Sequence, residues 1–126
     1  MIKGIDHIEL IVRDFEEYVE FLENLGFELL VRTDHHGASA ELKPPGENQP
    51  IFEIHQATGE EVIGVNHIAF AVDDIEAADA ALKEKGIATG GGPGYVEATG
   101  RTNINLRDPD GWRLQLVHAK RDMPPG

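Results

Sequence analysis

The chain has 126 residues, of which 40% are hydrophobic and 27% charged, and this balance fits a single domain over residues 1–126. It contains no cysteine, which excludes disulfides, thiolate metal sites and cysteine nucleophiles. The net charge of −12 argues against nucleic acid as a partner. No apolar run is long enough for a signal sequence or a membrane span, so we expect a soluble, cytoplasmic protein.

The sequence repeats itself after sixty residues. Residues 4–27 align with residues 64–87, and eight of the 24 aligned positions are identical, where chance gives about one or two. Each copy opens with an apolar, β-branched segment, IDHIELIV or VNHIAFAV, which is typical of a strand. Both segments keep a histidine, His7 and His67, at the same place.

A helix is expected after each of these strands. Asp14 and Asp74 stand at N-cap positions, and Gly26 and Gly86 stand where the helices should end. Between them, residues at helical spacing mark one face of each helix. They are Phe15, Tyr18, Val19, Leu22 and Leu25 in the first copy and Ile75, Ala78, Leu82 and Lys85 in the second.

Three further strands are expected in each copy. They are FELLVRT, ASAELK and PIFEIHQ in the first, and YVEA, TNINLR and WRLQLVH in the second. His35 and His36 are expected in a hairpin turn, and residues 119–126 in a frayed tail. The predicted fold is α+β, with two tandem βαβββ modules at about 4–57 and 62–119 that form a curled mixed sheet around a cleft. We expect the two modules to share one core.

Strand alternation predicts which side chains enter the cleft, because successive residues point to opposite faces. In the first strand the apolar residues Ile8, Leu10 and Val12 suit the helix-covered face, which leaves His7 and Glu9 in the cleft. The same rule assigns further cleft residues, namely Glu53, His55, His67, Arg113 and Gln115.

The cleft residues form two matched pairs. FEIHQ aligns with LQLVH at an offset of sixty-two, which makes Glu53 the counterpart of Gln115. His7 with Glu53 and His67 with Gln115 then offer two imidazoles, one carboxylate and one amide oxygen. This donor set suits a divalent metal and leaves positions open for water or substrate.

Three segments in order resemble the vicinal oxygen chelate (glyoxalase / bleomycin resistance protein / dioxygenase) superfamily. They are IDHIELIVRDFEEYVEFLENLGF, VNHIAFAVDDIEAADAALKEKGI and RDPDGWRLQLVH, and the resemblance covers residues 4–118. It implies a divalent ion (nickel, cobalt, zinc, manganese or iron) bound by His7, Glu53, His67 and Gln115. Gln115 departs from the pattern, because glyoxalase I and methylmalonyl-CoA epimerase usually have glutamate there.

The resemblance implies a metal-dependent lyase or isomerase of the glyoxalase I or methylmalonyl-CoA epimerase type. It would act on a small carbonyl-bearing substrate through a metal-stabilised, enolate-like intermediate. Glu53 is the first candidate for the catalytic base and Glu9 the second. His55, Arg113 and Arg101, the last in a loop near the cleft, are candidates for substrate binding. A homodimer is expected, with ligands from one subunit or from both.

Three alternatives remain open. A ring-cleaving dioxygenase would use His7, His67 and Glu53 as a facial triad. A fosfomycin-type thiol transferase fits both histidines but expects an acid at position 115. A metal-free binding protein like the bleomycin-resistance proteins needs an aromatic-lined cleft, whereas alternation assigns Trp112 to the packed face.

Overall fold

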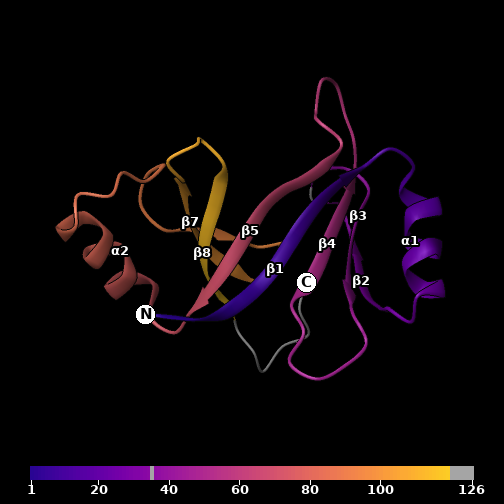
Figure 1. Cartoon of the computed structure of the whole chain (residues 1–126), viewed down its shortest axis with the longest axis horizontal. Coiled ribbons are helices and arrows are strands. Elements are labelled where there is room, and N and C mark those ends of the chain that lie inside the picture. The colour runs from indigo at the N-terminus through magenta and orange to yellow at the C-terminus, as the bar shows by residue number, and fades with distance from the viewer. Residues whose placement is uncertain (35, 120–126) are drawn as a thin grey trace.

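The computed structural model describes residues 1–34 and 36–119, which form an eight-stranded mixed sheet and two helices (Figure 1). In chain order the elements are β1 (Ile2–Val12), α1 (Phe15–Asn24), β2 (Glu28–Thr33), β3 (Ser39–Lys43), β4 (Ile51–Gln56), β5 (Gly64–Val72), α2 (Ile75–Glu84), β6 (Gly94–Val96), β7 (Arg101–Arg107) and β8 (Arg113–Ala119). The expected α+β fold of two βαβββ modules is confirmed. The expectations for His35 and for the tail beyond residue 119 lie outside the described residues.

The two halves of the sheet follow the same pairing rules. The strand order is β2-β3-β4-β1-β5-β8-β7-β6. β1 pairs parallel with β4, and β5 pairs parallel with β8. The antiparallel pair β1–β5 joins the halves, and α1 and α2 lie at opposite ends of the molecule (Figure 1). The first strand of each module therefore stands at the centre of the sheet.

Both helices begin and end as the sequence predicts. Asp14 and Asp74 accept the N–H groups of Glu17 and Ala77 at 3.1 and 3.0 Å, which satisfies one free donor at each N-terminus. Gly26 and Gly86, with φ of +98° and +72°, follow the C-caps in a conformation that favours glycine. No helix in residues 1–34 and 36–119 is long and apolar enough to cross a membrane.

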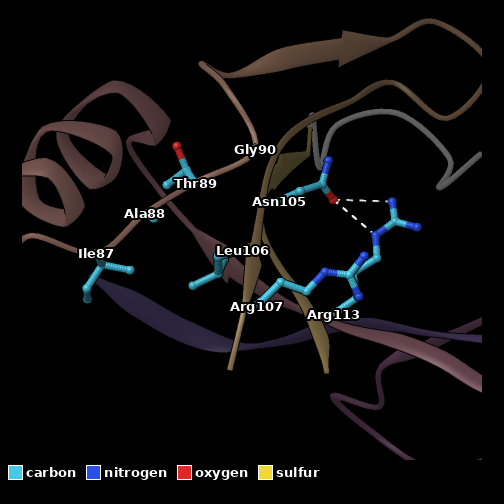
Figure 2. Close-up of a pocket in the computed structure, with 8 residues that line it drawn as sticks. All are labelled: Ile87, Ala88, Thr89, Gly90, Asn105, Leu106, Arg107 and Arg113. Carbon is cyan, nitrogen blue, oxygen red and sulfur yellow. Dashed lines mark hydrogen bonds between the residues drawn. The ribbon is translucent and has the colours of Figure 1, made fainter. Parts of the chain in front are cut away.

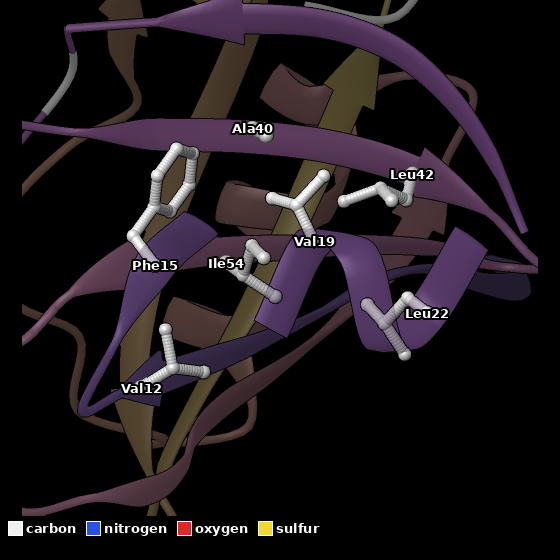
Figure 3. Close-up of a cluster of buried hydrophobic side chains, with 7 residues drawn as sticks. All are labelled: Val12, Phe15, Val19, Leu22, Ala40, Leu42 and Ile54. Carbon is white, nitrogen blue, oxygen red and sulfur yellow. The ribbon is translucent and has the colours of Figure 1, made fainter. Parts of the chain in front are cut away.

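The expectation of one shared core is wrong, because the buried apolar side chains form two clusters. Figure 3 shows the first, in which side chains of α1 pack on the strands of its own module. It contains Val12, Phe15, Val19, Leu22, Ala40, Leu42 and Ile54, and the second, beside α2, contains Val72, Ala78, Leu82, Ile104 and Leu116. Each buried Val, Leu, Ile or Phe side chain stabilises the fold by about 1.5–3 kcal/mol. Polar side chains occupy the region where the two modules meet.

Two apolar residues were assigned wrongly to packed positions. Trp112 precedes β8 and is 55% exposed, because its backbone N–H closes a turn by donating to the Asp108 carboxylate at 2.7 Å. Leu25, at the C-cap of α1, is 56% exposed. The strand begins one residue later and the helix ends one residue earlier than the sequence pattern suggests.

Candidate active site

Two histidines from the central strands meet at the bottom of the cleft. His7 on β1 and His67 on β5 are 2% and 3% exposed. Their Nε2 atoms are 3.2 Å apart, and the rings meet edge to face. The prediction that the repeated histidines come together across the module boundary therefore agrees with the geometry.

Each imidazole is held by the residue that precedes it. His7 Nδ1 lies 2.8 Å from the Asp6 carboxylate, and His67 Nδ1 lies 2.7 Å from the Asn66 side-chain oxygen. Because these oxygens accept, both Nδ1 atoms carry the proton. Burial, with the nearby charges of His7 and Arg113, lowers the pKa of His67 to about 3. His67 is therefore neutral and directs its Nε2 lone pair toward His7, as a metal-ligating imidazole does.

The donor atoms around this pair fit a divalent metal in part. Ligands about 2.1 Å from an ion and at right angles to each other lie roughly 3 Å apart, which matches the separation of the histidines. Gln115 Oε1 is buried and has no hydrogen-bond partner among the described residues. Glu53 Oε2 is 4.0 Å from His7 Nε2, and no three His, Asp or Glu side chains in residues 1–34 and 36–119 converge on one point. The two histidines fit as they stand and the Gln115 oxygen is available as a donor, whereas Glu53 has to turn toward them.

Two carboxylates lie beside the histidines with opposite protonation. Glu9 on β1 and Glu53 on β4 are register partners and are hydrogen-bonded to each other. Burial, reinforced by Glu53, raises the pKa of Glu9 to about 9. For Glu53, burial is outweighed by His7, by the hydrogen bond from Glu9 and by Arg101, so its pKa is lowered. One protonated and one ionised carboxyl side by side suit proton transfer.

Arg101 corrects the expectation of a loop residue, because it begins β7 and is 1% exposed. Its Nε donates to Asp6 at 2.7 Å, and its two terminal nitrogens donate to Glu41 at 3.1 and 3.0 Å and to Glu53 at 3.3 Å. Although burial opposes the charge, these carboxylates raise the pKa of Arg101. Because its N–H donors already bind carboxylates of the protein, Arg101 positions site residues and does not present a pair of N–H donors to a substrate.

The other two candidates for substrate binding differ in position. His55 is 3% exposed and lies behind Glu9, with Nδ1 3.4 Å from that carboxylate and Nε2 3.1 Å from Glu61, so its place does not favour contact with substrate. Arg113 faces the cleft and donates to the side-chain oxygens of Asn66 and Asn105.

The predicted residues surround one small cavity of about 230 Å³. All of them except His55 line it, together with His36, Val96, Thr99, Asn103 and Asn105. Four polar residues that shape the site were missed in the sequence: Asp6, Glu41, Asn66 and Asn105. The sequence could have identified Asp6 and Asn66, since each directly precedes a repeated histidine. It could not have identified Glu41 and Asn105, because their position in the site depends on strand register.

The paired βαβββ modules and their common polar cleft define the class of protein. A family model described as the Glyoxalase/Bleomycin resistance protein/Dioxygenase superfamily matches residues 4–116, so the chain belongs to this superfamily. This confirms the resemblance inferred from the three sequence segments. No curated protein matches the chain significantly.

Solved structures of methylmalonyl-CoA epimerases share this fold. A variant of the Streptomyces coelicolor enzyme in complex with 2-nitronate-propionyl-CoA is 25% identical, with a TM-score of 0.80 over 99% of this chain and 100% of its own. An epimerase in complex with methylmalonyl-CoA and NH4+ is 24% identical, with a TM-score of 0.80 over 99% and 100%. The Mycobacterium tuberculosis enzyme is 19% identical, with a TM-score of 0.82 over 96% and 91%. The last two show the fold, and the first also supports an enzyme of the isomerase type.

Proposed function

We propose that this chain is an isomerase that moves a proton beside a carbonyl group, with a divalent metal held by His7, His67, Glu53 and Gln115. The observation that carries the proposal is the pair of Nε2 atoms 3.2 Å apart, each on a ring anchored through Nδ1. Nickel, cobalt, zinc, manganese and iron all suit this set of nitrogen and oxygen donors. The buried Gln115 oxygen without a partner supports its inclusion.

The carboxylates of the chain would perform the proton transfer. When bound, the metal supplies Lewis-acid polarisation of the carbonyl, which makes the neighbouring C–H more acidic. Both carboxyl groups line the cavity beside the histidines, and Glu53, the ionised one, is the first candidate for the base. Glu9, the second candidate, is protonated at neutral pH and would accept a proton only after it has given up its own. His55 and Arg101 contact these carboxylates and orient them.

The substrate would be a small carbonyl compound, and the acyl-CoA thioesters named for the similar epimerases are the first class to test. A metal-free binding protein is less well supported, because no Phe, Tyr or Trp of the described residues lines the cavity. The polar wall suits chemistry on a carbonyl better than it suits stacking against a drug.

Hydrogen exchange provides the test. The protein, loaded with each of the five metals, is incubated with methylmalonyl-CoA in D2O, and deuterium at the α-carbon is followed by mass spectrometry. We expect exchange above the uncatalysed rate, lost on chelation and in His7→Ala, and reduced at least about a hundredfold in Glu53→Gln. The control is Glu60→Gln, which removes an exposed acid outside the cavity. Metal-loaded protein without exchange, or exchange unaffected by His7→Ala, would contradict the proposal.

The expected homodimer also belongs to this proposal. Ile2, Ile5 and Val65, on the two central strands, are 50%, 45% and 43% exposed and supply apolar surface for a second subunit. Light scattering after size exclusion should give twice the chain mass of 13.8 kDa. A mass of one chain at micromolar concentration would reject the dimer.

A further inference from the structure

A second cavity, of about 560 Å³, lies next to the candidate active site, and Figure 2 shows the residues that line it. It is bounded by β7, β8 and residues 87–90, which follow α2. Gly90 N–H donates to the Asn105 carbonyl at 2.8 Å, which fixes this segment to the edge of β7. Arg113 and Asn105 line both cavities, so the two spaces share a wall.

Two arginines face each other in this cavity. Arg107 on β7 and Arg113 on β8 are direct partners in the antiparallel register, and Figure 2 shows both side chains at the cavity. Such partners have Cβ atoms about 5 Å apart, and like charges placed in this way destabilise a sheet. Within residues 1–34 and 36–119 neither arginine makes an ion pair. Arg107 donates to the Gly111 carbonyl, and Arg113 donates only to amide oxygens.

The acidity of the whole chain makes it notable that Arg107 and Arg113 have no ion pair among the described residues. The protein has 23 acidic and 11 basic residues, so carboxylate partners are abundant. Arg101, by contrast, contacts three carboxylates. Two neighbouring guanidinium groups without an ion-paired carboxylate among the described residues create a local positive potential in a strongly acidic protein, and an anion in the cavity would relieve their repulsion.

We propose that Arg107 and Arg113 bind an anionic group of the substrate, a carboxylate or a phosphate, while its carbonyl lies at the histidine pair. Guanidinium groups bind both anions through paired N–H donors. Gln115 and Arg113 are two residues apart on β8, about 7 Å along the strand, so one small molecule can reach both subsites. This inference rests on the proposed function for the carbonyl end of the substrate, but the anion site can be tested without turnover.

Calorimetric titration at low ionic strength tests the site with inorganic phosphate and with malonate. We expect the wild type to bind at least one of them, and both Arg107→Gln and Arg113→Gln to weaken that binding about tenfold or more. Arg13→Gln is the matched control, since Arg13 is exposed and lies outside both cavities. No binding to the wild type, or binding unchanged in both cavity variants, would overturn the proposal. Arg107 is exposed and bonds only one turn carbonyl, so its variant decides the matter even if Arg113→Gln fails to fold.

Two ligands identify the source of the anion. If the pair binds a phosphate of a thioester, acetyl-CoA should bind more tightly than S-acetylpantetheine, which carries no phosphate, and Arg107→Gln should reduce the difference. If it binds a carboxylate, Arg107→Gln should leave that difference unchanged, and malonate should bind more tightly than acetate. Anion binding without exchange in D2O would support the anion site and contradict the proposed isomerase function. Exchange without anion binding would contradict the anion site and support the isomerase function.

Discussion

The two modules line one cleft with equivalent positions but with different charge. At four places where the first module has a carboxylate, the second has an amide or alanine at the equivalent position in the repeat or in the strand register: Asp6 and Asn66, Glu9 and Ala69, Glu41 and Asn105, and Glu53 and Gln115. We call the first set the acidic half-site and the second the amide half-site. The histidine is the feature that both keep.

This difference explains where the arginines lie. Buried carboxylates destabilise a fold unless they are paired, and the acidic half-site is compensated by Arg101, which reaches it from β7 of the other module. Amides need no counter-charge, so Arg113 on the amide half-site remains without a carboxylate. Under the proposed function, the proton would be transferred on the acidic side and the anionic part of the substrate would be bound on the amide side.

Removal of Arg101 should have the largest effect on this comparison. Arg101→Met leaves Asp6, Glu41 and Glu53 buried without their cation, and we expect a loss of about 3–5 kcal/mol in the free energy of unfolding. Arg113→Met, the same change on the amide side, should cost about 1 kcal/mol. Urea denaturation at pH 7 measures both. Equal losses would show that the two half-sites do not differ electrostatically.

Exchange of the residues that anchor the histidines should have a smaller effect. Asp6→Asn weakens the ion pair with Arg101, and we expect a loss of about 2 kcal/mol. Asn66→Asp keeps an acceptor for His67 and gains a partner in Arg113 at 3.3 Å, so stability should change by less than about 1 kcal/mol. Urea denaturation with a chelator present separates these effects from metal binding. A larger loss of stability for Asn66→Asp than for Asp6→Asn would contradict the inference that only the acidic half-site depends on a paired charge.

A carboxylate at position 115, matching Glu53 in the first module, should raise the affinity of the site for metal. Gln115→Glu replaces an amide oxygen with a carboxylate, and we expect metal to bind about tenfold more tightly, since ligand charge sets the affinity of such sites. Competition with a chromophoric chelator measures the dissociation constant. Gln49→Glu adds the same charge in an exposed loop and should leave the constant unchanged. Unchanged binding in Gln115→Glu would remove residue 115 from the ligand set.

The smallest effect concerns Glu61, which contacts His55 behind the acidic half-site. The backbone N–H of Thr58, then His55 and the Thr58 hydroxyl, hold the pKa of Glu61 at about 2, below its usual 4.5. A lowered pKa means that this stabilisation is complete above pH 4.5 and is lost as the pH falls toward 2. The difference in unfolding free energy between wild type and Glu61→Gln should therefore shrink over this interval, whereas Glu60→Gln should show no such trend. A difference that stays constant with pH would contradict the assignment.

Local patterns in the sequence were sufficient for the elements and for much of the site. The repeat, the capping aspartates and the helix-ending glycines predicted both helices, because these signals act over a few residues. Alternation placed His7, Glu53, His67 and Gln115 on one face, because a strand sends every second side chain to the same side. These inferences need no knowledge of which strands are neighbours.

Only the tertiary structure decided how these side chains are paired. Arg101 looked like a loop residue, yet it is buried because acids up to 95 positions away in sequence surround it. Arg107 and Arg113 face each other only through the β7–β8 register, and Glu41 reaches the site only through its pairing with Glu53. Sequence determined the face on which each residue lies, whereas contacts between distant strands determined which charges meet and which remain open to a ligand.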